Sequence, residues 1–353
     1  MAIVGGSLEV VKTLRAEINL LLKKEEKMWR QRSRSIWLKD GDRNTKYFHG
    51  CASQRRRRNN IKGVRHHNGN WQENEDQVAR VFLEYYRSLF TASDLRNIEE
   101  TVAPIPQVVT PSMNDSLSRE FTSVEVEQAI AQMSPSTTPG PDGMPPILYK
   151  KFWHIVGPDT IKGILSCLNS GQLLTSINQT YITLIPKVKS LTRVIEFCPI
   201  SLCNVLYKIL SKVLANRLKP ILTHIISETQ SAFVPGRLVT DNVLVAFETL
   251  HHMHSTKIGR GGAMALKLDM SKAYDHVEWA YLQKLMEKMG FNPRWISLTM
   301  MCISSVSYSI LINEEPHGLI KPSRGLRQGD PLSPYLFLLC VEGLYHMIKQ
   351  AEQ

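Results

Sequence analysis

The segment Leu266-Lys-Leu-Asp-Met-Ser-Lys-Ala-Tyr-Asp275 passes from an apolar run into a stretch with two acidic residues. We expect residues 263–268 to form a β-strand with Asp269 at its carboxyl end, where a rigid sheet can hold a metal-binding carboxylate in place. An aspartate after a strand is also a common turn residue. Asp275 and Glu278 have the spacing of a capping box, which favours a helix N-cap over a metal ligand for Asp275. A second motif is therefore needed before Asp269 can be assigned to chemistry.

That second motif is Ser323-Arg-Gly-Leu-Arg-Gln-Gly-Asp-Pro-Leu-Ser-Pro334, which stands before an apolar C-terminal helix. The corner at Gly329 would let the backbone approach a flat ligand closely, because glycine has no Cβ. Gln328 can form amide hydrogen bonds at this corner, and Arg324 or Arg327 can bind phosphate. The alternative is an ordinary loop that leads into a helix N-terminus.

The spacing of apolar residues predicts an α+β fold in which helices alternate with a few strands. The predicted helices cover residues 7–34, 76–90, 124–133, 146–155, 160–169, 206–224, 277–289 and 331–350. The predicted strands cover 180–185, 263–268 and 307–313, and the Asn68-Gly69 dipeptide predicts a β-hairpin over 61–71. Residues 93–122 are rich in Pro, Ser and Asn and lack this periodicity, so we expect a linker there.

The composition is that of an ordinary globular protein, with 353 residues of which 43% are hydrophobic and 21% charged. This excludes a wholly disordered chain. No apolar run reaches about 18 residues, so we expect no membrane span, and residues 1–9 lack the pattern of a secretory signal. The six cysteines include no Cys-x-x-Cys pair. This favours reduced thiols in an intracellular protein and argues against a zinc site.

Positive charge is concentrated near the N-terminus. Residues 1–70 contain 17 Lys and Arg against 6 Asp and Glu, whereas the rest of the chain contains 26 of each. A basic block of this kind indicates a polyanionic partner, most often nucleic acid. The run Arg55, Arg56, Arg57 and Arg58 can contact phosphates, and the alternatives are a nuclear-localisation patch or a plain exposed run. We therefore expect nucleic-acid binding and, from the same patch, a nuclear location.

Six motifs in chain order resemble those of the reverse transcriptases of non-LTR (LINE-type) retrotransposons, most of all plant elements. They are Pro139–Gly143, Thr183–Lys187, Pro199–Leu202, Gln230–Arg237, Leu268–Asp275 and Arg324–Pro334. The resemblance runs from about Ser123 to the C-terminus, and residues 25–90 resemble the region that precedes the polymerase in those elements. It implies a right-hand polymerase divided into a basic helical connecting region (1–92), a linker (93–122), fingers (123–262) and a partial palm (263–353).

The resemblance also implies roles for individual residues. Asp269 would be the first metal-binding aspartate, with the backbone carbonyl of Met270 beside it. Tyr274 would be the aromatic ring that lies under the incoming sugar and blocks a 2′-hydroxyl. Gln328 and Gly329 would lie against the incoming nucleotide and the template.

Four basic residues are implied as contacts of the nucleotide phosphates or the template, namely Lys187, Arg237, Arg324 and Arg327. The implied reaction is nucleotidyl transfer, in which a DNA primer 3′-hydroxyl attacks a deoxynucleotide on an RNA template. Two Mg²⁺ ions stabilise the attacking and leaving oxygens in such a reaction, and they need at least two well-placed carboxylates.

The sequence also departs from the family's pattern. The 353 residues contain no Asp-Asp pair, although the family's motif C supplies one, and we identify no thumb. Cys198 stands where the family usually has Arg, and Thr137 where it commonly has Lys. We therefore expect a truncated polymerase that is inactive as the isolated chain. The alternatives are a non-enzymatic nucleic-acid-binding remnant and a chain that misfolds and has no cellular role.

Overall fold

The computed structural model describes residues 3–33, 45–94, 96–188, 191–255 and 264–352. The chain divides into two compact units. Unit 1 contains residues 1–73 and 185–198, and unit 2 contains residues 74–184 and 199–353. Each unit is described by itself.

Among its described residues, unit 1 contains two helices, a small hairpin and a second segment from residue 185 to residue 198. The helices are α1 (Ile3–Ser33) and α2 (Thr45–Asn59), and the hairpin pairs β1 (Val64–Arg65) with β2 (Trp71–Gln72). The His66 N–H donates to the Asn70 carbonyl at 2.8 Å, and Gly69 adopts a φ of 90°, which glycine reaches without steric cost. The hairpin predicted from the Asn-Gly dipeptide is therefore confirmed.

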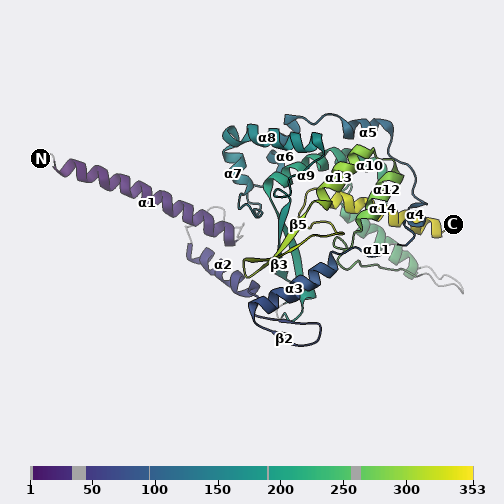
Figure 1. The fold of residues 1–353 in the computed structure, drawn as a ribbon, viewed down its shortest axis with the longest axis horizontal. Helices are drawn as coiled ribbons and strands as arrows, with labels where there is room; N and C mark the ends of the chain where they lie inside the picture. Colours follow the sequence, from purple (N-terminus) through teal and green to yellow (C-terminus); the bar gives the residue numbers. More distant parts are fainter. Residues whose placement is uncertain (1–2, 34–44, 95, 189–190, 256–263, 353) are drawn as a thin grey trace. The chain divides into compact units, whose positions relative to one another are not determined.

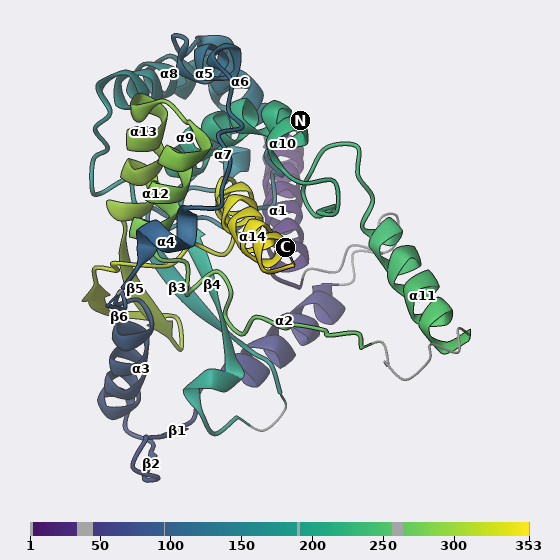
Figure 2. The same ribbon diagram turned by 90° about the vertical axis from the view of Figure 1, so that its right-hand side faces the viewer.

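A four-stranded sheet runs in the order β4-β3-β5-β6. Its strands are β3 (Gln179–Pro186), β4 (Phe197–Cys203), β5 (Ser307–Ile312) and β6 (Glu315–Ile320). β3 and β5 are parallel, with Gln179 opposite Ser307, whereas β5 and β6 form an antiparallel hairpin. Asn313 and Glu314 join this hairpin with φ of 51° and 80°, as a two-residue turn between twisted strands requires. Helix α3 (Glu75–Leu89) packs on β5 and β6 (Figure 2).

Helices form most of unit 2 (Figure 1). They are α4 (Ile98–Val102), α5 (Pro111–Ser118), α6 (Ser123–Gln132), α7 (Pro146–Lys151), α8 (Trp153–Ser170), α9 (Val205–Leu218), α10 (Leu222–Ile225), α11 (Val239–Ser255), α12 (Trp279–Met289), α13 (Pro293–Ser304) and α14 (Ser333–Ala351), with short 3₁₀ turns at Val194–Glu196 in unit 1 and Lys219–Ile221 in unit 2. The result is a mixed helix-and-sheet fold, in agreement with the predicted α+β class.

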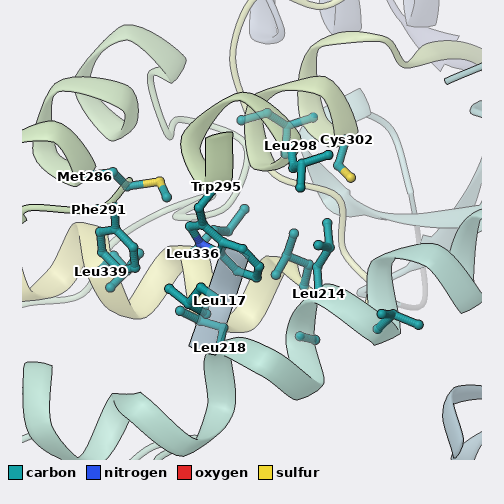
Figure 3. Close-up of a cluster of buried hydrophobic side chains, with 14 of the residues drawn as sticks. Leu117, Leu214, Leu218, Met286, Phe291, Trp295, Leu298, Cys302, Leu336 and Leu339 are labelled. Atoms are coloured by element: carbon teal, nitrogen blue, oxygen red, sulfur yellow. The ribbon is translucent and has the colours of Figure 1, made fainter. Parts of the chain in front are cut away.

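The core of unit 2 is built around Trp295, which is fully buried (Figure 3). Leu117 of α5, Leu214 of α9 and Leu336 of α14 belong to the same cluster. Packing of this kind supplies most of the helical stability, because isolated helices of this length are marginal in water. Residues from four distant parts of the sequence therefore depend on one another for burial.

The segment 93–122 differs from the predicted linker. It contains α4 and α5, and its apolar residues Val102, Ile105, Val109 and Leu117 are all buried in the core. Thr110 caps α5 by accepting a hydrogen bond from the Met113 N–H at 3.3 Å, and Pro111 follows at the first helical position. Pro111, one of the residues that suggested a linker, is thus part of a helix-start signal.

The strand predicted over 263–268 is wrong for the described residues 264–270, which form neither helix nor strand. Leu266 and Leu268 are 74% and 63% exposed. A strand needs a hydrogen-bonded neighbour, and none of the strands in the described ranges pairs with this segment. Ala263 lies outside the described residues. The N-cap predicted at Asp275 is also wrong, because α12 begins at Trp279 and its N-cap is Glu278.

Helix α11 stands apart from the other helices of unit 2, and none of its residues is buried (Figure 2). Its exposed apolar residues include Val243, Leu244 and Phe247. In the part of the chain that the structure describes, no helix combines the length and the apolar character needed to cross a membrane.

Candidate functional site

A cavity of about 460 Å³ lies in unit 2 between the end of α6, helix α9 and the loop before α14. Its lining is formed by Gln132, Met133, Thr137, Lys208, Lys212, Tyr274, Gln328, Gly329, Asp330, Pro331 and Pro334. We call it the cleft. The structure thus brings together three residues that the sequence analysis proposed from two separate motifs, Tyr274, Gln328 and Gly329. A volume of this size falls in the range of ordinary small-molecule sites.

Backbone hydrogen bonds hold the two motifs side by side. The Gly325 N–H donates to the Val277 carbonyl at 2.7 Å, and the Leu326 N–H donates to the Tyr274 carbonyl at 2.8 Å. Gly325 has a φ of 96°, and a Cβ there would come within 3.0 Å of the Asp275 carbonyl oxygen. Glycine is therefore required at this position for both the conformation and the close approach.

Strand β4 holds the second motif at Gln328 through a backbone hydrogen bond. The Ser201 N–H donates to the Gln328 carbonyl at 3.1 Å. Gly329 follows with a φ of 106°, and both Gln328 and Gly329 are exposed. The side chain of Gln328 is therefore presented from a rigid corner of the backbone, as a binding residue should be.

The ring of Tyr274 is held in place by an aromatic contact. It stacks on Phe337 of α14, with ring centroids 4.9 Å apart and an interplanar angle of 17°. Tyr274 is half-buried, and this burial raises the pKa of its phenol above the ordinary value. The stacked ring therefore presents a fixed flat face.

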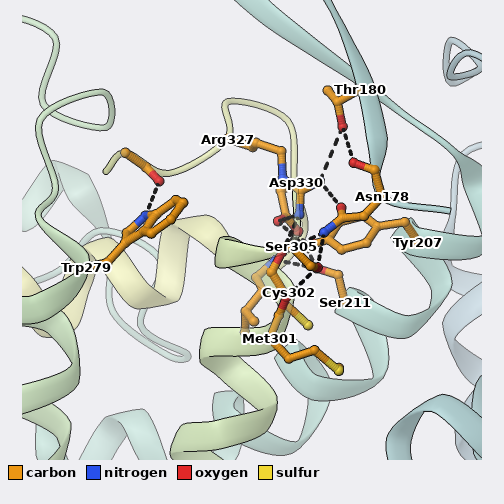
Figure 4. Close-up of polar contacts among 12 residues, drawn as sticks. Asn178, Thr180, Tyr207, Ser211, Trp279, Met301, Cys302, Ser305, Arg327 and Asp330 are labelled. Atoms are coloured by element: carbon orange, nitrogen blue, oxygen red, sulfur yellow. Dashed lines mark hydrogen bonds and ion pairs between the residues drawn. The ribbon is translucent and has the colours of Figure 1, made fainter. Parts of the chain in front are cut away.

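Under the cleft lies a buried polar network (Figure 4). The Arg327 guanidinium forms an ion pair with Asp330 at 3.4 Å and donates to the Cys302 carbonyl at 2.9 Å and to the amide oxygen of Asn178. Asp330 also accepts hydrogen bonds from the hydroxyls of Tyr207, at 2.7 Å, and Ser211. Arg327 is 3% exposed. The prediction that it binds phosphate is therefore wrong, because its donors are already used inside the protein.

Two further arginines are also used internally. Arg324 pairs with Glu278 at 3.0 Å and donates to the Leu89 carbonyl at 2.8 Å. Arg237 donates to the carbonyls of Gln230 and Ile226, at 2.6 and 3.1 Å. These guanidinium groups donate to carbonyls in loops and at a helix end, and their predicted contacts with nucleotide phosphates or template stay predictions. Sequence motifs did not distinguish such structural arginines from ligand-binding ones.

The remaining predicted residues are not among those that line the cleft. Lys187 is exposed in unit 1, where its N–H donates to the Glu196 carbonyl at 2.9 Å. Asp269 and Met270 are exposed in the irregular segment 264–270 and do not line the cleft. Arg55 to Arg58 are exposed on α2. Their predicted roles stay predictions.

The carboxylates of the cleft do not fit a two-metal site. Among the described residues that line it, Asp330 is the one acidic side chain, and it is 3% exposed and bonded to Arg327, Tyr207 and Ser211. Two Mg²⁺ ions need at least two open carboxylates together with water and phosphate oxygens. No reaction step can therefore be derived through metal ions from these residues.

Two lysines of α9 were missed by the sequence analysis. Lys208 and Lys212 stand one turn apart and both line the cleft. Lys208 is 4% exposed and donates to the Thr138 carbonyl at 2.9 Å, and burial lowers its pKa. Their four-residue spacing in a mostly apolar helix was the available signal, because charged residues are rarely buried without a partner.

The Pro139–Gly143 motif docks on the start of α9. The Asp142 N–H donates to the Asn204 side-chain oxygen at 3.2 Å. A Cβ at Gly140 would overlap the backbone nitrogen of Asn204. The glycine at 140 is therefore explained by close backbone packing, which positions the Thr137 loop beside Lys208.

Residues 185–353 match the reverse transcriptase (RNA-dependent DNA polymerase) family. The chain contains a reverse transcriptase domain homologous to the polymerases of non-LTR retrotransposons. Enzymes of this family generally use divalent metal ions, an RNA template and nucleotides. The resemblance drawn from the six motifs is confirmed at this level.

Two relatives cover most of the chain. The uncharacterized 149 kDa protein of transposon TX1 from Xenopus laevis is 29% identical over 322 residues, which is 90% of this chain and 24% of that protein. The Pol polyprotein of retrotransposable element R2DM from Drosophila melanogaster is 27% identical over 71% of this chain and 25% of its own length. The chain thus spans about a quarter of the curated relatives it matches.

A plant protein matches a short part of the chain. The uncharacterized mitochondrial protein AtMg01250 of Arabidopsis thaliana is 60% identical over 43 residues, 12% of this chain and 35% of that protein. This gives weak support to the predicted likeness to plant elements.

Proposed function

We propose that this chain forms the fingers and part of the palm of an RNA-directed DNA polymerase, and that the cleft binds the incoming deoxynucleotide beside the template. The observation that carries the proposal is that Tyr274 and Gln328, from two motifs separated by about fifty residues of sequence, line one cavity. A neutral, stacked ring and an amide on a rigid corner are suited to bind a sugar and a base.

Each of these residues has a distinct proposed role. The fixed ring of Tyr274 fills the space that a 2′-hydroxyl would need, so that a ribonucleotide is bound less well than a deoxynucleotide. Gln328 donates and accepts hydrogen bonds at the edge of the base pair. Asp269 and the carbonyl of Met270 are proposed as Mg²⁺ ligands, and the cleft itself supplies no second open carboxylate.

The proposed partners are an RNA template and a DNA primer or target. Arg55 to Arg58 support this assignment, because they place four guanidinium groups on exposed positions of α2. Contacts of this kind with phosphates are independent of sequence and give affinity that falls steeply with salt. We propose the same patch as the basis of a nuclear location.

Photolabelling with an azido derivative of dATP tests the nucleotide assignment. In the purified chain with primer–template, label is expected on peptides that contain Tyr274 or Gln328, and dATP should compete better than ATP. Tyr274→Ala should reduce this preference for dATP about tenfold or more, since it removes the ring that excludes the hydroxyl. Tyr345→Ala, which alters a tyrosine outside the cleft lining, is the control. Label confined to other peptides, or an unchanged preference in Tyr274→Ala, would contradict the proposal.

Primer extension tests the expected inactivity of the isolated chain. Purified 1–353 with Mg²⁺, primer–template and deoxynucleotides should give no extended product above the no-enzyme level on a sequencing gel. The physical reason is that the two-metal mechanism needs at least two open carboxylates. A product that disappears on Asp269→Ala would overturn this expectation and would show that the chain assembles a complete site.

A further inference from the structure

Lys212 occupies an unusual position in the cleft. It is half-buried on α9 and lines the same cavity as Tyr274 and Gln328. Its ammonium group has no hydrogen-bond or ion-pair partner within the ranges that the structure describes. A cation that is partly withdrawn from water and unpaired is costly, and an anionic ligand would remove that cost.

The other charges around the cleft are already compensated. Lys208 donates to the Thr138 carbonyl, and Asp330 is held by Arg327, Tyr207 and Ser211. Lys212 is therefore the open charge among the described lining residues, and the cleft is electropositive at this point. Burial, and to a smaller extent the neighbouring charge of Lys219, lowers the pKa of Lys212. A bound anion would raise this pKa, because it stabilises the charged ammonium group.

We propose that Lys212 binds a phosphate group beside Gln328, so that a nucleotide unit is held between a cation on α9 and the glutamine corner. The proposal rests on the proposed function and names a residue that the family motifs did not supply. The phosphate has two possible sources, a phosphodiester of the template strand or the triphosphate of the incoming nucleotide. Lysine suits this task as a point charge on a flexible stem.

Lysine footprinting on the full 353-residue chain tests the proposal. An acylating reagent is applied, and the modification rate of each lysine is measured by mass spectrometry in three samples: no ligand, a twelve-nucleotide single-stranded RNA, and dATP. We expect ligand to slow acylation of Lys212 at least fivefold while Lys162, an exposed lysine of α8 outside the cleft, changes less than twofold. Protection by RNA assigns the phosphate to the template strand, and protection by dATP alone assigns it to the nucleotide.

A charge-removing variant gives a second readout. Lys212→Gln should reduce the slope of log affinity for RNA against log salt by about 0.7, the amount for one phosphate on a single strand, and Lys212→Arg should retain it. Unchanged acylation of Lys212 with both ligands overturns the proposal. If azido-dATP still labels the Tyr274 or Gln328 peptide in that case, only the role of Lys212 fails. If that label is also absent, the proposed function fails with it.

Discussion

Arg327→Met is expected to destabilise unit 2 by about 3–5 kcal/mol, because it leaves Asp330 buried without its cation. The two side chains are 2% and 1% exposed, so neither charge can turn to solvent. The variant also leaves the Asn178 amide oxygen without its donor, and a buried unsatisfied acceptor adds to the loss. The stack of the guanidinium on the Tyr207 ring, at 3.8 Å, disappears as well.

Urea unfolding followed by tryptophan fluorescence measures this loss. Arg294→Met, an exposed arginine on α13, should stay within about 0.5 kcal/mol of the parent. The double variant Arg327→Met with Asp330→Asn should lose less than the sum of the two single losses, because it contains no uncompensated charge, with a coupling of about 0.5–3 kcal/mol. If Arg327→Met is as stable as Arg294→Met, the network does not hold the loop that carries Gln328.

The elements that could be predicted from the sequence are those whose pattern is local. The hairpin at Asn68-Gly69 and the helices α3, α6 and α12 carry their own turn or periodicity signal, and the structure forms all of them. Strand β5 was also predicted, at 307–313 against the observed Ser307–Ile312. In each case the residues that define the element lie next to one another in the chain.

The elements that could not be predicted depend on distant partners. Residues 264–270 have the composition of a strand, but pairing depends on a neighbour that local sequence does not report. Residues 93–122 look like a linker because they are rich in Pro, Ser and Asn, but Thr110 and Pro111 start a short helix there, and the burial of Leu117 depends on α9, α13 and α14. Tertiary packing overrides local signals in both segments.

The candidate site also contains residues that could be predicted from the sequence and residues that could not. Tyr274 and Gln328 were predicted from motifs and line one cleft. Arg327 was misjudged and Lys212 was missed, because a charged residue has the same sequence signature whether it pairs internally or faces a ligand. The two residues differ in the partners that the fold supplies. Arg327 has four acceptors, whereas Lys212 has none within the described ranges.

Arg217→Met should also cost about 3–5 kcal/mol, through the segment that looked like a linker. Arg217 is 6% exposed and forms a fork on Glu125, with distances of 2.7 and 2.9 Å. The same guanidinium donates to the Leu117 carbonyl at 2.9 Å and lies 3.6 Å from the centre of the Phe121 ring. Its removal therefore releases the end of α5 and the start of α6 together, which thermal and urea unfolding would record.

A matched control acts on the same carboxylate. Arg119 contacts Glu125 at 3.8 Å but is 67% exposed, so Arg119→Met should cost less than about 1 kcal/mol.

The dependence of stability on acid pH gives an independent readout. Burial would raise the pKa of Glu125, but the hydrogen bonds from Arg217 and Thr122 outweigh it and the pKa lies below its ordinary value of 4.5. The resulting stabilisation is present above pH 4.5 and is lost as the pH falls through the folded-state pKa. Arg217→Met should flatten this acid loss, and equal losses in Arg119→Met and Arg217→Met would show that solvent screening, not the buried fork, governs Glu125.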